Sequence, residues 1–181
     1  MDPIKVGIVS LILFVSLFYM VFFMLLLVKY KKKFDEAPKP DYSYTPIVSV
    51  VIPAYNEEKD LPATMKSILN LNYPRDKLDI IIVDDGSTDR TYEIAKAYER
   101  YGVRVFRQPN RGKAAALNYG LRYARGEFIA TMDVDSFVES NIIYKLLAYF
   151  DSPKVGAVTP AVKVKEDGTL LNSLQKYEYL Y

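Results

Sequence analysis

Cysteine, histidine and tryptophan are absent from the 181 residues of the chain. Without Cys and His the chain can form no disulfide, no zinc site of the usual ligands and no Cys or His nucleophile. Any bound metal must therefore be a hard cation held by oxygen ligands. The formal net charge is only +2, and outside the N-terminal region no cluster of basic residues indicates a nucleic-acid partner.

Long apolar runs are confined to the N-terminus, where the 23 residues from Val6 to Val28 contain no charge. At about 1.5 Å per residue, such a helix would reach roughly 34 Å and could cross a bilayer core of about 30 Å. A cleaved signal peptide is the alternative, but its apolar core usually has about 7–15 residues and ends in small residues. We therefore predict a single N-terminal transmembrane helix.

Four lysines follow the apolar run, at positions 29, 31, 32 and 33. The positive-inside rule then places everything after Val28 in the cytoplasm, with the helix in the cell membrane. The same lysines are expected to contact anionic membrane lipid. The predicted organisation is a membrane segment over residues 1–33, a proline-containing linker over 34–46, and one domain over 47–181.

Within this domain, short apolar runs alternate with helical patterns. Strands are predicted at residues 47–53, 78–83, 103–106 and 127–132, and helices at 61–71, 88–101, 113–124 and 139–150. Further strands at 155–158 and 161–164 and a helix at 170–181 complete the prediction. This alternation indicates an α/β fold with a mostly parallel sheet covered by helices on both faces. In such sheets ligands bind beyond the carboxyl ends of the strands.

Two carboxylates, Asp133 and Asp135, end the predicted strand at residues 127–132. Both could reach one hard cation, particularly if the strand gives way to a turn after Met132. An Asp-x-Asp that merely caps a helix or closes a turn is the alternative.

Two further strand ends also carry polar residues. Asp84 and Asp85 follow the second strand and could accept hydrogen bonds from a nucleobase or a ribose hydroxyl, while Tyr55, after the first strand, could form an aromatic wall. The structural alternative is a turn and helix cap over residues 85–88, with Asn56 or Asp60 capping the preceding helix.

The loop at residues 108–113 precedes a predicted helix. Its amides, with Arg111 and Lys113 beside them, would suit a phosphate group. A solvated basic loop is the alternative.

Four segments in this order, residues 51–57, 84–89, 110–113 and 133–135, resemble the signature of family-two glycosyltransferases with the Rossmann-like GT-A fold. The membrane helix, its lysine flank and residues 175–179 resemble the membrane-anchored processive synthases of hyaluronan, chitin, cellulose and poly-N-acetylglucosamine. The resemblance implies that Asp85 contacts the base and that Lys113 lies near the base or the diphosphate. It implies that Asp133 approaches the ribose or metal and that Asp135 ligates Mg or Mn. The nucleoside pocket would be lined by Pro53, Ala54, Tyr55 and Glu57.

The family's acidic catalytic base and its Gln-x-x-Arg-Trp motif are both expected beyond Tyr181, so no catalytic residue is assigned in this apparently truncated domain. We expect the donor-binding part of an inverting enzyme that transfers a sugar from a nucleotide-diphosphate sugar, foremost a UDP-sugar, to a glycan or lipid-linked acceptor. A polyprenyl- or dolichyl-phosphate sugar transferase is one alternative. A non-catalytic nucleotide-binding membrane protein is another, if the natural chain ends at Tyr181.

Overall fold

The computed structural model describes residues 2–35 and 37–161, and the chain separates into two compact units between Lys39 and Pro40. The first unit contains helix α1, Pro3–Asp35, which includes the whole uncharged run from Val6 to Val28. Its segment Pro3–Lys29 is long and apolar enough to cross a membrane, and none of that segment is buried by protein. Its exposed apolar surface is therefore available to lipid.

The predicted linker has neither helix nor strand between residues 37 and 47. Its second half is attached to the domain, because the ring of Tyr42 packs 4.8 Å from that of Tyr144 and the Tyr73 hydroxyl donates to the carbonyl of Pro46. We expected an extended tether over 34–46, but α1 continues to Asp35 and residues 42–46 form part of the domain surface.

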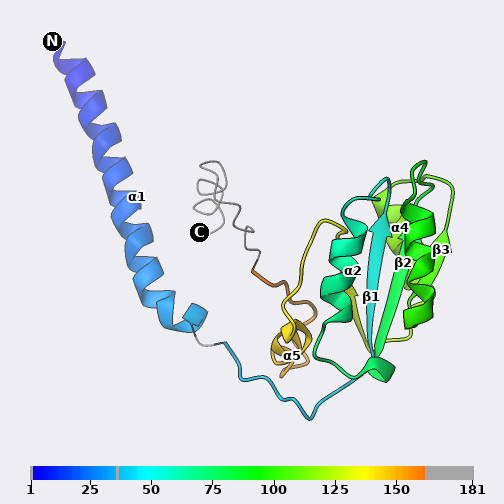
Figure 1. Ribbon diagram of the computed structural model, residues 1–181. Coiled ribbons are helices and arrows are strands. Elements are labelled where there is room, and N and C mark those ends of the chain that lie inside the picture. Colours follow the sequence, from blue (N-terminus) through cyan, green and yellow to red (C-terminus); the bar gives the residue numbers. More distant parts are fainter. Residues whose placement is uncertain (1, 36, 162–181) are drawn as a thin grey trace. The chain divides into compact units, whose positions relative to one another are not determined.

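In the described part of the second unit, the strands form a four-stranded parallel sheet in the order β3-β2-β1-β4 (Figure 1). Parallel pairing joins β1 to β2, β1 to β4 and β2 to β3. The strands are β1 Val48–Ala54, β2 Leu78–Asp84, β3 Arg104–Arg107 and β4 Phe128–Thr131. The chain runs outward from β1 to β3 and then returns to the other side of β1, so strand order reverses between β1 and β4.

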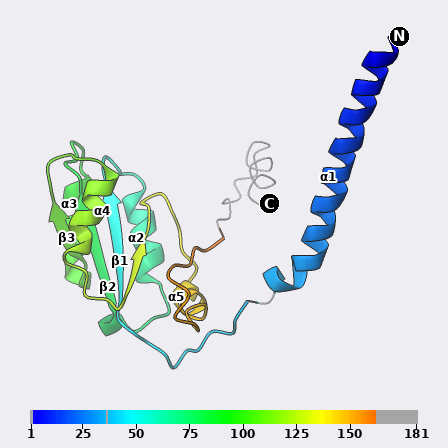
Figure 2. The same cartoon turned by 180° about the vertical axis from the view of Figure 1, so that it is seen from behind.

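Helices cover both faces of this sheet, as predicted. Figures 1 and 2 show the two sides, with α2 and α3 on one face and α4 on the other. The bounds are α2 Leu61–Leu69, α3 Thr91–Ala97, α4 Lys113–Leu121 and α5 Ile142–Leu147, with short 3₁₀ turns η1 Arg75–Lys77 and η2 Glu99–Tyr101.

Alternation along β1 decides which residues face which helices. Val50 and Ile52 belong to the larger core with α2, α3 and α5, whereas Val51 faces α4. Helix α4 lies very close to the sheet at Gly120, where a Cβ atom would stand 2.5 Å from Cγ1 of Val51. Only glycine fits there without displacing a strand side chain.

Some predicted elements differ in extent. The helix expected at residues 88–101 is divided into α3 and η2, and the one expected at 139–150 has only the six residues of α5. The strand expected at 155–158 was wrong, because residues 155–161 form no helix or strand. This run contains Gly156, which weakens a strand, and Pro160, which has no backbone donor. The strand at 161–164 and the helix at 170–181 lie outside the described residues, except for Ala161.

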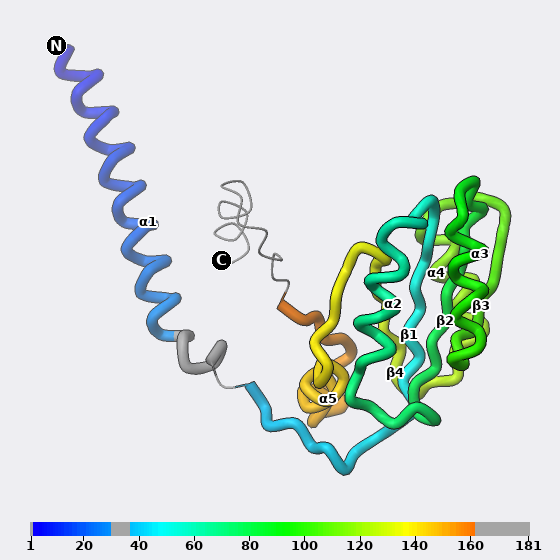
Figure 3. Tube along the Cα trace, in the orientation of Figure 1, coloured from blue at the N-terminus to red at the C-terminus, as the bar shows by residue number. Residues whose placement is uncertain are grey.

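The carboxyl ends of all four strands point to the same end of the domain, as the Cα trace in Figure 3 shows. The loops that carry the predicted ligand-binding residues, after β1, β2, β3 and β4, therefore leave the sheet at one rim.

Candidate functional site

A pocket of about 500 Å³ lies at this rim, beside the point between β1 and β4 where strand order reverses. Such a reversal leaves a crevice between diverging loops, which is where open α/β sheets bind ligands. Its walls come from segments far apart in the chain: Pro53, Ala54, Tyr55, Glu57, Asp85, Asn110, Gly112, Lys113, Asp133, Val134 and Asp135.

Eight of the ten residues proposed from the sequence line this pocket, and Asp84 and Arg111 do not. Asp84 is fully buried at the end of β2. Its Oδ2 atom lies 3.0 Å from Nε of Arg107, a charge contact without the alignment of a hydrogen bond, and Oδ1 accepts from the Ser87 amide at 3.3 Å. Asp84 therefore ties β2 to β3 and to the following loop, beneath the pocket.

Asp85 holds the loop that follows β3. Its carboxylate accepts hydrogen bonds from Nε2 of Gln108 at 2.6 Å and from the amides of Arg111 at 3.0 Å and Gly112 at 2.7 Å. The loop can approach because Gly86, at φ +74°, has no Cβ, which would lie 2.7 Å from the Asn110 nitrogen. Asp85 thus shapes the pocket wall while keeping part of its acceptor capacity toward the pocket.

This arrangement changes the expected phosphate site. We expected the amides before α4 to be open to a phosphate, but those of Arg111 and Gly112 already donate to Asp85. Arg111 also does not line the pocket, whereas Lys113 does. The cationic contribution of this loop to the pocket therefore comes from Lys113, the first residue of α4.

The loop after β1 is joined to the loop before α3 by reciprocal hydrogen bonds. Residues 56–58 and 87–91, which we call the clasp, exchange six of them, five from backbone amides and one from the Thr88 hydroxyl to Oδ1 of Asn56. The amides of Asn56, Glu57 and Glu58 donate to side chains across the gap, and two amides donate back. The pairs are Asn56 to Ser87, Glu57 to Thr91, Glu58 to Asp89, Thr88 to Asn56 and Arg90 to Glu58.

The clasp takes the place of the caps that the structural alternative assigned to Asn56 or Asp60. Asp60 makes no side-chain cap at α2, and Asn56, in the left-handed region at φ +57°, receives the Thr88 amide instead. The amide of Thr91, the first residue of α3, donates to Oδ1 of Asp89 at 2.9 Å. The Asp89 side chain therefore satisfies a backbone donor at the start of α3. The result is a fixed wall from which Tyr55, 45% exposed, and Glu57 face the pocket.

The acidic segment after β4 is oriented by its middle residue. Val134 is buried in the larger core, and its carbonyl accepts the hydroxyl of the buried Thr64 on α2. Asp133 and Asp135, on either side, are exposed and line the pocket. A turn does follow Met132, since the Ser136 amide donates to the Asp133 carbonyl at 3.2 Å. The two carboxylates therefore reach the same pocket.

Negative charge in the pocket is only partly compensated. Nζ of Lys113 lies 2.6 Å from Oδ1 of Asp133. Within residues 37–161, neither Asp135 nor Glu57 forms an ion pair. Burial raises the pKa of the Glu57 carboxyl above its ordinary value, and the charges of Asp60, Asp135 and Asp89 raise it further. The pocket is thus short of positive charge.

The carboxylates fit a hard divalent cation in one particular way. Among the described residues, no three acidic side chains gather closely enough to hold a metal alone. Magnesium-type sites commonly use one or two carboxylates and complete their shell with water and phosphate oxygens. Asp133 and Asp135, beside the uncompensated Glu57, are such a partial donor set, so the residues fit a cation that shares a diphosphate.

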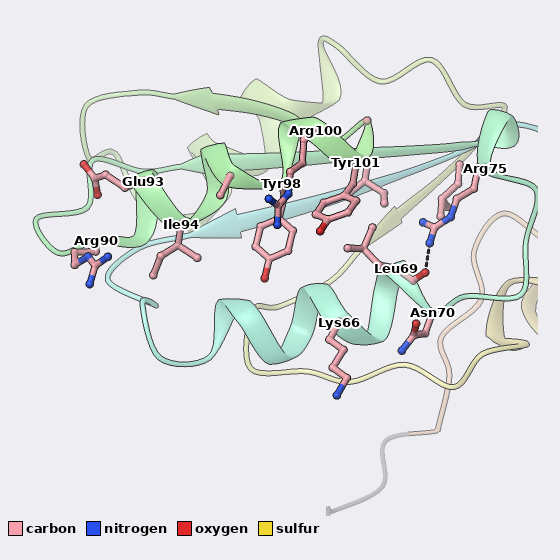
Figure 4. Close-up of a pocket in the computed structure, with 14 residues that line it drawn as sticks. Lys66, Leu69, Asn70, Arg75, Arg90, Glu93, Ile94, Tyr98, Arg100 and Tyr101 are labelled. Carbon is pink, nitrogen blue, oxygen red and sulfur yellow. Dashed lines mark hydrogen bonds between the residues drawn. The ribbon is translucent and has the colours of Figure 1, made fainter.

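A larger hollow lies elsewhere, between α2 and α3 with η2 (Figure 4), with a volume of about 780 Å³. Ile94 of α3 and Tyr98, which directly follows α3, point toward α2 in this view, and Arg90 and Arg75 lie at opposite ends. It shares no residue with the rim pocket and contains none of the paired acids. Size alone would favour it, but the convergent charged groups are at the rim, so we take the smaller pocket as the candidate site.

Sequence reasoning did not name Asn110, Gly112 and Val134 among the lining residues. The signal was available for the first two, since they belong to the same motif as Lys113. Val134 lies between two residues that were named, but its inward position depends on the contact of its carbonyl with α2.

Comparison with known proteins supports the family resemblance that the sequence motifs indicated. The sequence profile described as Glycosyl transferase family 2 matches residues 49–180. The chain is 37% identical over 143 residues to the "Probable glycosyltransferase YdaM" of Bacillus subtilis, covering 75% of this chain and 32% of that protein. It is 32% identical over 144 residues to the poly-beta-1,6-N-acetyl-D-glucosamine synthase of Staphylococcus epidermidis, covering 78% and 34%. The chain thus spans about a third of the length of these relatives.

Solved structures share the fold. The mannosyltransferase PcManGT from Pyrobaculum calidifontis, in complex with GDP-Man and Mn²⁺, superposes with a TM-score of 0.65 at 31% identity, over 77% of this chain and 43% of that one. TarS 1-349 of S. aureus, in complex with UDP-GlcNAc, gives a TM-score of 0.55 at 29% identity, over 58% and 31%. By its matched residues, its relatives and its GT-A fold, the chain belongs to glycosyl transferase family 2.

Proposed function

We propose that this chain is the membrane-anchored, donor-binding part of an inverting glycosyltransferase that uses a nucleotide-diphosphate sugar, foremost a UDP-sugar. The observation that carries the proposal is the convergence of Tyr55, Asp85, Lys113, Asp133 and Asp135 on one rim pocket. An aromatic wall, acceptors for a base or ribose, a cation and a pair of carboxylates are the groups that a nucleoside diphosphate requires.

Each wall would contact one part of the donor. Tyr55 would stack on the base, while Asp85, fixed by three donors, would accept from it with its remaining acceptor capacity. Lys113 would neutralise a phosphate at the start of α4, where the helix dipole also favours negative charge. Pro53, Ala54 and Glu57 would complete the nucleoside side of the pocket.

Asp133 and Asp135 would hold Mg²⁺ or Mn²⁺. When bound, such a cation supplies Lewis-acid stabilisation of the departing diphosphate. The acceptor hydroxyl, on a glycan or lipid-linked acceptor, would attack the anomeric carbon from the side opposite the diphosphate. A general base would remove the proton of that hydroxyl, and we assign this role to none of the described residues that line the pocket.

The location is part of the proposal. The segment Pro3–Lys29 would anchor the domain in the cell membrane, and the lysines that follow would place the pocket in the cytoplasm. Cytoplasmic placement gives the pocket access to soluble nucleotide sugars. Cysteine-accessibility labelling in intact cells, with one cysteine introduced at Asp2 and another at Asp151, tests it. Labelling of the Asp151→Cys protein from outside would contradict the orientation.

Nucleotide binding tests the central claim. Calorimetric titration of the chain in detergent with UDP in the presence of Mn²⁺ should show binding, and GDP and dTDP measured in parallel give the base preference. Asp135→Asn should weaken UDP binding at least about tenfold, because it removes a charged cation ligand. Asp151→Asn, an exposed acid outside the pocket, is the matched control and should leave binding unchanged. Absence of binding by all three nucleotides, or full binding by Asp135→Asn, would contradict the proposal.

A further inference from the structure

Lys113 and Asp133 are engaged with each other at the mouth of the rim pocket. Nζ of Lys113 lies 2.6 Å from Oδ1 and 2.8 Å from Oδ2 of Asp133, so one ammonium group faces both carboxylate oxygens. The side chains are 61% and 50% exposed. The pair is therefore held by charge at a wet surface and is free to separate.

Among the described residues that line the pocket, Lys113 is the single cationic one, against four acids. Three donors from the neighbouring loop occupy most of the hydrogen-bond acceptor capacity of the Asp85 carboxylate. Glu57 and Asp135, in contrast, have no ion-pair partner within residues 37–161. One lysine therefore carries the positive charge that stabilises this cluster before any ligand binds.

A divalent cation that uses both oxygens of Asp133 needs the place that the Lys113 ammonium occupies. A diphosphate that enters the same pocket offers Lys113 another anion. We propose that Lys113 acts as an internal counter-ion on Asp133 in the donor-free protein and is exchanged for the cation when a nucleoside diphosphate arrives.

This exchange rests on the proposed function and adds that nucleotide binding controls the affinity of the site for the cation. Without nucleotide, Lys113 competes with the cation for Asp133 and keeps cation affinity low. With nucleotide, the phosphate takes over Lys113 and Asp133 becomes available. Cation and diphosphate consequently strengthen each other's binding, and linkage makes that effect reciprocal. Lys113 is a positioning and gating residue for the cation as well as a phosphate contact.

The structure provides the means for the exchange. Lys113 is the first residue of α4, after Gly112 at φ +88°, so its backbone is fixed by the helix while its four-carbon side chain extends into solvent. Only side-chain rotation is needed to move the ammonium from Asp133 toward a phosphate. Such rotations in exposed side chains take picoseconds to nanoseconds and would not limit binding.

The test measures Mn²⁺ binding without nucleotide, from the loss of the electron paramagnetic resonance signal of free Mn²⁺ on titration into the 181-residue chain in detergent. Lys113→Met removes the competitor and should tighten Mn²⁺ binding about two- to fivefold, the range that an exposed ion pair supports. Lys113→Arg keeps the ion pair and should bind Mn²⁺ as weakly as the unaltered chain.

Two further variants separate exchange at Asp133 from a general change in charge. Arg111→Met removes a nearby positive charge that does not line the pocket, and it should leave Mn²⁺ affinity unchanged. In an Asp133→Asn background, Lys113→Met should bring no gain, because the shared carboxylate is gone. A gain that persists in that background, or an equal gain in Arg111→Met, overturns the proposal. Equal Mn²⁺ titrations of Lys113→Met and the unaltered chain, including no binding in either, overturn it as well.

The same set of variants distinguishes this proposal from the proposed function. If the unaltered chain binds UDP but Lys113→Met does not change Mn²⁺ affinity, the exchange is wrong and the nucleotide site stands. If UDP does not bind while the Lys113→Met gain appears and disappears with Asp133→Asn, the counter-ion role is supported and the proposed donor is wrong.

Discussion

One acid at the amino end of the sheet and two acids of the rim pocket at the carboxyl end are compensated to very different extents. At the amino end, Asp79 accepts from Ser49 at 2.6 Å, from Nε and Nη2 of Arg104 at 2.9 and 2.6 Å, and from the Arg125 amide at 3.2 Å. Burial tends to raise the pKa of Asp79, but these hydrogen bonds outweigh it and hold the pKa below its ordinary value. At the carboxyl end, Glu57 has its pKa raised and Asp135 has no ion pair within the described part of the domain.

The difference separates structural acids from binding acids. Both oxygens of Asp79 are already used by groups of the protein, so Asp79 connects β1, β2, β3 and the loop before β4. At the other end, Glu57 and Asp135 have no ion-pair partner among the described residues, and burial together with the charge of Asp135 raises the pKa of Glu57, which is a cost to the fold unless a ligand neutralises them. Between Asp79 on one side and Glu57 and Asp135 on the other, engagement by groups of the protein distinguishes the structural role from the binding role.

The largest predicted effect comes from removing the saturated acid. Asp79→Asn leaves the guanidinium of Arg104, 22% exposed, without its charge partner and should lower the free energy of unfolding by about 2–3 kcal/mol. UDP binding at temperatures where the variant is folded should be unchanged. Urea unfolding followed by circular dichroism measures the loss, with Asp151→Asn as the surface control. A loss no larger than that of the control would show that the amino-end network is not structural.

Gly86→Ala tests whether Asp85 and its loop belong with the binding end. Alanine at φ +74° is strained, and its Cβ would meet the Asn110 nitrogen at 2.7 Å, so we expect a loss of about 2 kcal/mol and weaker UDP binding. Gly102→Ala is the matched control. Gly102 has φ +85° but nothing within 4 Å of the added carbon, so strain alone should cost about 1 kcal/mol and UDP affinity should stay the same. Equal UDP affinity in both variants would separate the loop from the site.

The pH dependence of unfolding should distinguish the two ends by sign. Because the pKa of Asp79 is lowered in the folded state, its stabilisation is complete above its ordinary pKa of 3.8 and is lost as pH falls below that value. The pKa of Glu57 is raised above its ordinary 4.5, so protonation favours the folded state, and its destabilising effect grows as pH rises through the raised value.

Difference profiles of the two variants make this visible. We would measure urea midpoints from pH 3 to pH 7. In the unaltered chain the midpoint should fall at the acid end of this range, and Asp79→Asn should remove that fall. The unaltered chain should also show a smaller decline in the midpoint above pH 4.5, which Glu57→Gln should remove. If both variants changed the profile in the same direction, the opposition between the two ends would be incorrect.

The smallest predicted effect is the most diagnostic. Asp135→Asn removes a repelling charge and should leave the free energy of unfolding within about 0.5 kcal/mol of the unaltered chain, or slightly above it. It should also move the pKa of Glu57 toward its ordinary value, because the Asp135 charge contributes to raising it. The carboxyl resonance of Glu57 in a pH titration by nuclear magnetic resonance reports that change. A clear loss of stability would instead assign Asp135 to the fold.

The layered architecture was predictable because its signals are local. The apolar runs of β1 and β2 begin within one residue of the predicted bounds, and Gly102, at φ +85°, ends η2 at the predicted place. The failures were also physical. A run such as 155–158 has the composition of a strand, but a strand needs a neighbour to pair with, and pairing cannot be seen in a short window.

The site was predictable as a set of loops and less so as a set of roles. The sequence could not tell which of Asp84 and Asp85 faces the pocket, because that depends on where β2 ends and on Arg107, more than twenty residues away. It also could not show that Asp85 would engage the amides expected to bind phosphate. The clasp could not be predicted either, because each of its hydrogen bonds joins residues 31–34 positions apart in the sequence.

The clasp has a consequence for changing what the pocket accepts. Because backbone amides on each loop are satisfied by side chains of the other, neither loop holds its shape alone. Exchanging the segment around Tyr55 with that of another enzyme would leave unmatched donors unless residues 87–91 were transplanted with it. The two segments are therefore the smallest unit by which this wall can be inherited or engineered.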